Sequence, residues 1–364
     1  MPAGEIFTTR DALTERYDPA SLPERTDEMA VLTDALATPH EGHAGMLVYG
    51  RPGSGKTTAV RHAFADTLAD DGAPVRVEGR PGWSAYALAH ALAEALGLDL
   101  ARTGHAYDDV IDAVRAALGD SRRYALLVDD ADRVGGDTLS SVVADAFEGV
   151  GPGRLVVVSN ELTLRNELSA TARALLGDRE LAFAPYDRAT LRSIVERRAA
   201  VALREGAVAD GVLDRVAAVG TDRGGDARAA ITLLRSAADL AVEESVDRIT
   251  DEHVERARDD LRVLELADEL STLPVHERLT LAALARLART SETPAGVEEI
   301  QVAYESVCTD ANLTASGGRA VRNYLANLVE RGLVTKLDGP GRLRYEPEPR
   351  PTDFAAAFAD HEGT

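Results

Sequence analysis

The chain has 364 residues and a formal net charge of −21, with 45% hydrophobic and 4% aromatic residues. A single core rarely grows past about 250–300 residues, so this length predicts two or three domains. No apolar run reaches the roughly 18 residues of a membrane span, and no signal pattern opens the chain, so we expect a cytoplasmic protein without membrane contact. The single cysteine, Cys308, excludes an internal disulfide and a multi-cysteine zinc site.

An acidic chain normally argues against a nucleic-acid partner. Two of the 40 basic residues are lysines, Lys56 and Lys336, and the rest are arginines. Acid-rich, lysine-poor surfaces are typical of proteins from salt-accumulating halophiles such as halophilic archaea. In molar salt the Debye length falls to about 3 Å, so local geometry rather than net charge selects partners. A GC-rich genome that favours arginine codons is the alternative explanation.

Residues 1–185 alternate short apolar runs with helical stretches. The predicted strands are Met46–Tyr49, Val75–Val77, Tyr124–Val128, Leu155–Ser159 and Leu181–Phe183. This alternation predicts an α/β domain with a mostly parallel sheet.

A glycine-rich loop follows the first predicted strand and precedes the helical segment Thr58–Leu68. Residues 50–57 fit G-x-x-x-x-G-K-[ST], in which backbone N–H groups and a helix N-terminus bind phosphate. Lys56 is expected to reach the β- and γ-phosphates, and the Thr57 hydroxyl to ligate Mg²⁺. The loop therefore predicts an ATP or ADP site that includes Gly50, Gly53, Ser54, Gly55, Lys56, Thr57 and Thr58.

Two acids end the predicted strand Tyr124–Val128. A hydrophobic strand that delivers an acid at its carboxyl end is the Walker B arrangement, so Asp129 is expected to hold Mg²⁺. Asp130 stands where the acid that polarises the attacking water is normally Glu. Because Asp is one methylene shorter, we expect slow hydrolysis. An acidic turn that caps a helix at Asp132 is the alternative.

The next predicted strand, Leu155–Ser159, is followed by Asn160. An amide at this strand tip is suited to orient the attacking water or to contact the γ-phosphate, which is the sensor 1 role. Ser-Asn after a strand is also common in turns.

Residues 187–262 contain no strand pattern and predict a helical lid. The predicted helices are Arg188–Arg204, Val212–Val219, Asp226–Glu243 and Asp251–Leu261. Asp226 is expected to cap the third of these helices. Arg228 in its first turn opposes the helix macrodipole, which favours a role on the γ-phosphate, called sensor 2.

Residues 270–346 predict three helices and a β-ribbon that turns at Asp338-Gly339-Pro340-Gly341. In the last helix, with Ser316 as its expected N-cap, one face is apolar and the other polar. The apolar face carries Val321, Tyr324, Leu325 and Leu328, and the polar face carries Arg319, Arg322 and Asn323. Arginine and asparagine on one exposed face suit a recognition helix in a DNA major groove. A protein-docking module is the alternative.

The ribbon is expected to form a wing against the phosphates or the minor groove of DNA. It begins at Lys336 and places Arg342 and Arg344 among the predicted DNA contacts.

In this order, the motifs resemble those of the archaeal origin-recognition initiators, which are AAA+ proteins related to eukaryotic origin-recognition and helicase-loading factors. Further segments that carry the resemblance are Glu5-Ile6-Phe7, Leu13, Tyr17-Asp18-Pro19, Leu22-Pro23-Glu24-Arg25, Phe183-Ala184-Pro185-Tyr186, Leu191 to Ile194, Arg197-Arg198, Gly225-Asp226-Ala227-Arg228, Leu273-Pro274-Val275-His276 and Tyr304-Glu305-Ser306-Val307-Cys308. The resemblance implies an AAA+ base at 1–185, a lid at 186–264, a winged-helix domain at 270–346 and a flexible tail at 347–364. It also implies that Tyr186 and Arg198 contact the nucleotide.

The implied function is to bind ATP and origin duplex DNA and to recruit or load the replicative helicase, together with other initiator paralogues. Two departures, Asp130 for Glu and Thr171 at the place of the arginine finger, suggest a divergent paralogue; Arg173 is a possible substitute for the finger. The alternative is a nucleotide-gated transcriptional regulator or adaptor with a winged-helix effector. A clamp-loader or branch-migration motor needs a reliable finger, so Thr171 argues against it.

Overall fold

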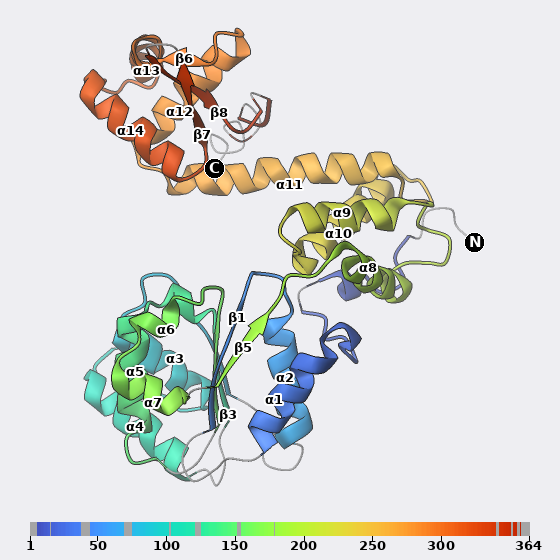
Figure 1. The fold of residues 1–364 in the computed structure, drawn as a ribbon, viewed down its shortest axis with the longest axis vertical. Coiled ribbons are helices and arrows are strands. Elements are labelled where there is room, and N and C mark those ends of the chain that lie inside the picture. The colour runs from blue at the N-terminus through green and yellow to red at the C-terminus, as the bar shows by residue number, and fades with distance from the viewer. Residues whose placement is uncertain are drawn as a thin grey trace. The chain divides into compact units, whose positions relative to one another are not determined.

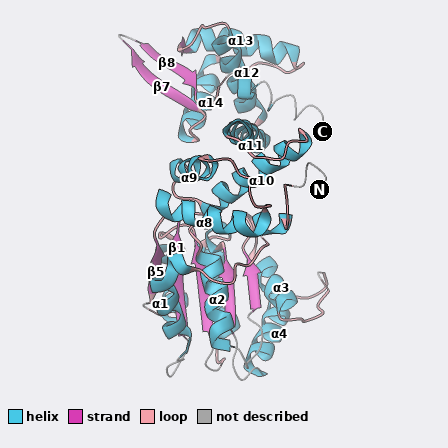
Figure 2. Cartoon of the chain, turned by 90° about the vertical axis from the view of Figure 1, so that its right-hand side faces the viewer, coloured by secondary structure: helices cyan, strands magenta, loops and turns pink. Residues whose placement is uncertain are grey.

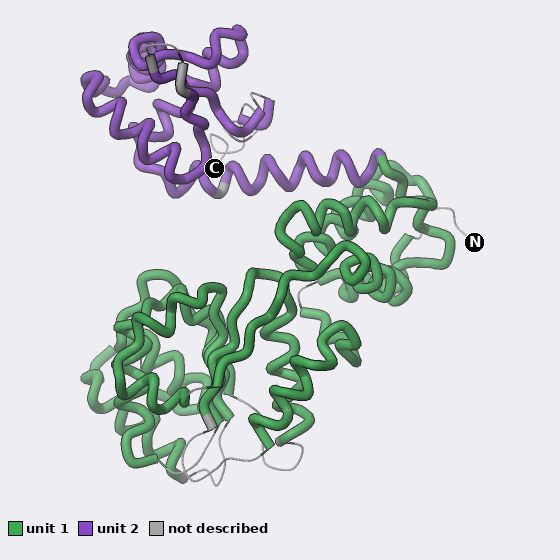
Figure 3. The backbone as a smooth tube through the Cα atoms, in the orientation of Figure 1, with its two compact units in different colours: residues 1–251 green, residues 252–364 purple. Residues whose placement is uncertain are grey.

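The computed structural model describes residues 6–14, 16–37, 44–68, 75–101, 103–120, 125–150, 154–177, 179–339, 342–350, 352–354 and 357. The side chains at positions 44, 68, 120, 268, 338, 339 and 342 are also outside the description. The chain divides into two units, residues 1–251 and residues 252–364 (Figure 3). Glu5 and most of the predicted tail lie outside the described residues.

The first unit contains a five-stranded parallel sheet, and all five predicted strands are confirmed with small differences in their ends, except that Tyr124 lies outside the described residues. The strands are β1 (Ala44–Gly50), β2 (Val75–Glu78), β3 (Ala125–Asp129), β4 (Arg154–Ser159) and β5 (Glu180–Phe183). Their order across the sheet is β2-β3-β4-β1-β5. The carboxyl ends of parallel strands meet at one edge, which is where ligands bind in open α/β sheets.

Helices cover both faces of this sheet (Figure 1). They are α1 (Thr26–Ala37), α2 (Lys56–Leu68), α3 (Ala85–Ala95), α4 (Tyr107–Asp120), α5 (Gly136–Phe147), α6 (Leu164–Glu167) and α7 (Ala170–Leu176), with 3-10 turns η1 (Arg10–Leu13), η2 (Pro23–Arg25) and η3 (Ala131–Arg133). Strand side chains alternate between faces. Met46 and Val48 therefore pack with the α1 and α2 core, while Leu47 packs with the core under α3 to α7.

The helical lid follows β5 and consists of α8 (Arg188–Ala202), α9 (Val212–Asp222) and α10 (Ala227–Glu243). The N-terminal segment runs beside the end of α8, where Phe7 bridges Leu203 and Thr8 N donates to Ala202 O at 2.8 Å. Chain segments far apart in sequence therefore build this part of the unit together.

Helix α11 (Asp251–Thr272) continues well past its predicted end at Leu261. It stops just before Leu273-Pro274, because the residue ahead of a proline is disfavoured in a helix. The lid and winged-helix boundaries near 264 and 270 stay predictions, and this helix runs through both positions.

The second unit has the predicted three helices and ribbon, as Figure 2 shows. These elements are α12 (Val275–Arg289), α13 (Val297–Asp310), α14 (Gly318–Glu330), β7 (Val334–Gly339) and β8 (Arg342–Pro347). A further strand, β6 (Ala295–Gly296), has two residues and is too short to be predicted from sequence periodicity. The sheet order is β6-β8-β7. Cys308 is fully buried in this core.

In the described part of the chain, no helix combines the length and the apolar character needed to cross a membrane.

Candidate nucleotide site and nucleic-acid interface

The loop between β1 and α2 has a backbone that only glycine adopts without strain. Gly53 and Gly55 have φ angles of +70° and +89°, in the left-handed region. A Cβ atom at Gly53 would overlap the carboxylate of Asp226, and one at Gly55 would overlap the hydroxyl of Tyr186. The glycines are therefore required both by the turn and by the close approach of residues on the lid side.

Lys56 begins α2 and is almost fully buried, with 5% of its surface exposed. Its Nζ donates to Gly50 O at 2.7 Å, Arg51 O at 2.9 Å and Asn160 Oδ1 at 3.1 Å. Burial lowers the pKa of Lys56, while the carboxylates of Asp129, Asp130 and Asp132 act in the opposite direction. The ammonium group thus connects the loop to the tip of β4.

Thr57 and Asp129, the two side chains expected to supply oxygen ligands to Mg²⁺, lie side by side. The Thr57 hydroxyl donates to Asp129 Oδ1 at 3.0 Å, and the carboxylate of Asp129 is buried. Mg²⁺ prefers oxygen ligands and often takes only one or two from protein, with phosphates and water completing its shell. In the parts of the chain that are described, no group of three or more His, Cys, Asp or Glu side chains is arranged to hold a metal ion. The residues therefore fit an ion held jointly with a nucleotide.

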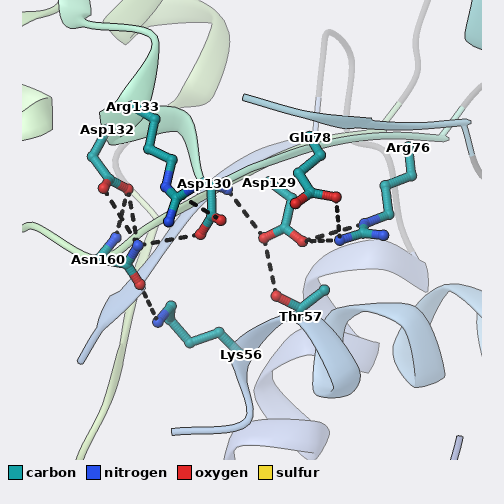
Figure 4. Close-up of polar contacts among 9 residues, drawn as sticks. All are labelled: Lys56, Thr57, Arg76, Glu78, Asp129, Asp130, Asp132, Arg133 and Asn160. Carbon is teal, nitrogen blue, oxygen red and sulfur yellow. Dashed lines mark hydrogen bonds and ion pairs between the residues drawn. The ribbon is translucent and has the colours of Figure 1, made fainter. Parts of the chain in front are cut away.

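The predicted base and the predicted sensor 1 residue contact each other. Asn160 Nδ2 donates to Asp130 Oδ1 at 3.2 Å, and Asn160 N donates to Asp132 Oδ1 at 2.8 Å (Figure 4). Asp130 has a left-handed φ of +46°, and it makes no side-chain capping bond to η3, so the helix-cap alternative is wrong. Lys56 is the third member of this network through Asn160.

The lid helix α10 begins against the phosphate loop. Asp226 caps it as predicted, accepting from Ala229 N at 3.0 Å, and Ala227 N donates to Gly53 O at 3.2 Å. Arg228 is exposed in the first turn, and its charge contributes to lowering the pKa of Lys56. The start of α10 and the loop are therefore one contact surface.

Tyr186 and Arg198 are the two further predicted nucleotide contacts. Tyr186 is 7% exposed, and this burial raises the pKa of its hydroxyl. Arg198 Nη1 donates to Ala12 O at 3.0 Å, and its guanidinium lies 4.5 Å from the centroid of the Tyr17 ring. Burial lowers the pKa of Arg198. Arg198 thus joins α8 to the N-terminal segment. The nucleotide contacts of Tyr186, Arg198 and the half-buried Thr58 stay predictions.

Helix α14 has the two faces that its periodicity predicts. Val321, Leu325 and Leu328 are fully buried. The polar residues Arg319, Arg322 and Asn323 are all exposed. The face predicted to read DNA bases is therefore available on the surface of its own unit.

The predicted N-cap of this helix is wrong. Gly317 is the N-cap of α14 and no side chain caps it. Ser316 instead shares a hydrogen bond of 3.2 Å with the hydroxyl of Tyr324, and its N–H donates to the hydroxyl of Tyr304 at 3.1 Å. Because its hydroxyl and its N–H group both bond to tyrosine hydroxyls, Ser316 does not cap the helix.

The wing is the antiparallel pair of β7 and β8. Lys336 and Arg344 are exposed, and Arg344 Nη1 donates to Pro294 O at 2.6 Å. The side chain of Arg342 and the turn at Pro340-Gly341 lie outside the described residues.

Comparison with known proteins agrees with this architecture. Residues 40–161 match the model of an AAA domain, residues 192–259 a Cdc6 AAA+ ATPase-type lid domain, and residues 268–346 the C-terminal winged-helix domain of CDC6. The ORC1-type DNA replication protein 2 of Haloarcula marismortui is 30% identical over 344 residues, which cover 90% of this chain and 83% of the relative. The chain belongs to the Orc1/Cdc6 family of DNA replication proteins.

Other members of the Orc1/Cdc6 family match over similar lengths. The ORC1-type DNA replication protein 10 of Halobacterium salinarum is 30% identical over 367 residues, covering 93% of this chain and 88% of the relative. The ORC1 protein of Aeropyrum pernix, whose structure is in complex with DNA, has a TM-score of 0.80 and 28% identity, covering 98% of this chain and 97% of that one. The predicted AAA+ base, lid and winged helix are therefore confirmed as the fold class.

One buried residue of this Orc1/Cdc6 chain has a structural role that its sequence does not reveal. Arg25, 5% exposed, donates from Nη2 to Ser54 O at 2.8 Å and to Ala184 O at 2.6 Å, and from Nη1 to Glu28 at 2.7 Å. Its guanidinium also lies 4.0 Å from the centroid of the Tyr186 ring. Arg25 belongs to the segment that carried the family resemblance, but nothing local predicts that it joins the loop to the start of the lid.

Proposed function

We propose that this chain is a replication initiator that binds ATP or ADP at its phosphate loop and uses the nucleotide to control its affinity for origin DNA. The observation that carries the proposal is the direct hydrogen bond from Ala227 N to Gly53 O. Phosphates bound by the loop would lie beside the start of α10, so their presence changes the contacts of the lid. The nucleotide then acts as a conformational switch.

Within this proposal the residues divide the chemistry. Thr57 and Asp129 hold Mg²⁺, which supplies neutralisation of phosphate charge. Lys56 and Arg228 bring positive charge to the phosphates, while Asn160 orients Asp130 as the base toward water. Because the Asp130 side chain is short, hydrolysis is slow and limits how fast the switch resets.

DNA binding in this proposal uses the exposed face of α14, the wing and the AAA+ domain. Support comes from the similarity to the Aeropyrum pernix ORC1 protein, whose structure contains DNA. Arginine pairs well with guanine edges and asparagine with adenine edges, so the α14 face is suited to the major groove. The bound complex then recruits or loads the replicative helicase with other initiator paralogues.

Genome-wide chromatin immunoprecipitation of the full chain tests this function. Peaks beside replication origins are the expected result. Peaks spread over promoters away from origins would overturn the initiator proposal and support a nucleotide-gated transcriptional regulator.

Replacing Arg322 with alanine tests base recognition. If Arg322 contacts a guanine, Arg322→Ala weakens binding to the recovered origin duplex by about 1–3 kcal/mol and leaves binding to a scrambled duplex nearly unchanged. Fluorescence anisotropy with both duplexes measures the difference. Arg286→Ala is the matched control, because Arg286 is an exposed arginine of the same unit that pairs with Asp310 at 3.1 Å. Equal affinity for both duplexes in the native protein and in the Arg322 variant would contradict base recognition.

The role of Asp130 predicts a loss of hydrolysis without a loss of binding. Asp130→Asn keeps the size of the side chain but removes the charge, so ATP hydrolysis should fall by about tenfold or more, in line with the contribution of a general base. Phosphate release measures hydrolysis, and a fluorescent ATP analogue measures binding. Asp137→Asn, at an exposed carboxylate early in α5, is the control. A change of less than twofold in hydrolysis would show that Asp130 is not the base.

A further inference from the structure

An arginine on the edge strand β2 is bonded to the carboxylate expected to hold magnesium. Arg76 Nη2 and Nε donate to Asp129 Oδ2 at 2.7 and 3.2 Å. The other oxygen of Asp129, Oδ1, accepts from Thr57 Oγ1 at 3.0 Å and from Asp130 N at 3.1 Å. Both oxygens of this carboxylate therefore have protein donors (Figure 4).

The register of the sheet explains why Arg76 reaches this site. In the parallel pairing of β2 with β3, Arg76 lies opposite Leu127 and Glu78 lies opposite Asp129. Paired residues share a face and side chains two positions apart point the same way, so these groups lie on one side of the sheet. Arg76 Nη2 is also 3.6 Å from Glu78 Oε2. The arginine is thus shared between a carboxylate at the site and one outside it.

The exposure of the three side chains shows which partner is the fixed one. The side chain of Asp129 is 4% exposed, whereas those of Arg76 and Glu78 are 43% and 57% exposed. A long, half-exposed arginine at a sheet edge has room to turn toward water, but the buried carboxylate does not move with it. Glu78 offers the guanidinium a second partner when it leaves Asp129.

The charges make Arg76 and a metal ion compete. Arginine stays protonated under all ordinary conditions, so its positive charge repels a divalent cation at the same carboxylate. An ion beside Thr57 that takes Oδ1 of Asp129 as a ligand meets a carboxylate whose negative charge is already partly neutralised by the two Arg76 bonds to Oδ2. We propose that Arg76 is a built-in competitor of Mg²⁺ at Asp129, with Glu78 as its alternative partner, so that the site needs more Mg²⁺ to bind Mg·ATP. This inference rests on the proposed Mg·nucleotide site.

The test is the Mg²⁺ dependence of ATP binding by the full chain. A fluorescent ATP analogue is titrated at a series of Mg²⁺ concentrations and also in the presence of a chelator. Arg76→Gln removes the charge but keeps hydrogen-bonding groups, and should lower the Mg²⁺ concentration at half-maximal binding by about fivefold, the upper range for a partly exposed ion pair. Binding in chelator should not improve, because Arg76 competes with the ion and not with the nucleotide.

Further variants separate competition from simple bracing of the edge strand. Arg76→Lys keeps the positive charge but loses the planar guanidinium, so its Mg²⁺ requirement should lie between the native value and that of Arg76→Gln. Glu78→Gln should raise the requirement, because Arg76 loses its alternative partner and the site loses a negative charge. Arg165→Gln is the matched control, because Arg165 pairs at 2.9 Å with Glu180 on the opposite edge strand β5.

The outcomes are distinct. An unchanged Mg²⁺ requirement in Arg76→Gln, with ATP binding intact, overturns this inference and leaves the proposed function standing. If Arg76→Gln fails to fold in a thermal melt, Glu78→Gln decides, and no rise in its Mg²⁺ requirement overturns the inference. Failure of the native protein to bind ATP at any Mg²⁺ concentration would instead overturn the nucleotide site itself.

Discussion

Lys56→Ala is expected to weaken ATP binding by about 100-fold or more. Lys56 is buried, and residues 1–251 contain no other lysine. Each hydrogen bond from its ammonium group to a phosphate is worth about 1.5–3 kcal/mol. The substitution also removes the bonds that connect Gly50 O, Arg51 O and Asn160 Oδ1. A fluorescent ATP analogue or calorimetry measures the affinity.

The second lysine of the chain provides the control. Lys336 is exposed on β7 in the other unit, so Lys336→Ala changes the net charge by the same amount and should leave ATP affinity unaltered. A thermal melt confirms that the Lys56 variant is folded. If the folded Lys56→Ala variant keeps its affinity for ATP, the loop at residues 50–57 is not the phosphate-binding site.

Arg25→Ala should strongly lower the stability of the first unit. Truncation leaves the carbonyl oxygens of Ser54 and Ala184 and the carboxylate of Glu28 without their buried partner. Breaking a buried charged contact of this kind costs about 3–5 kcal/mol. At about 2–4 °C per kcal/mol for a unit of this size, the melting temperature should fall by roughly 6–20 °C. Circular dichroism on heating measures it.

An exposed arginine nearby serves as the comparison for Arg25. Arg61, whose side chain is 37% exposed, pairs at 2.8 Å with Asp18, whose side chain is 47% exposed. Exposed ion pairs contribute about 0–1 kcal/mol, so Arg61→Ala should lower the melting temperature by only a few degrees at most. Equal decreases in the two variants would contradict the central role of Arg25.

Much of the nucleotide site was predictable because it depends on local patterns at strand ends. The glycine spacing ahead of Lys56, the acid after β3 and the amide after β4 each follow from a short stretch of sequence. Parallel strands then bring Asp130 and Asn160 to the same edge, where they are bonded. The apolar face of α14 was predictable for the same reason, since its spacing is that of one helix.

The two wrong predictions have different physical causes. Ser316 has the right residue type for a helix cap, but the hydroxyls of Tyr304 and Tyr324 bind it instead. The predicted helix end at Leu261 is too early, because α11 continues through polar residues until the breaker Pro274.

By itself, the sequence determined the phosphate loop, the strand and helix order and the family, because these are recorded in contiguous residues and their periodicity. Only the tertiary structure decided that Arg76 lies on Asp129, that Arg25 joins the loop to Ala184, and that α10 begins against Gly53. Those contacts depend on strand register and on the packing of the lid. An arginine in the sequence specifies a charge and a reach, and the fold selects the carboxylate or carbonyl that it binds.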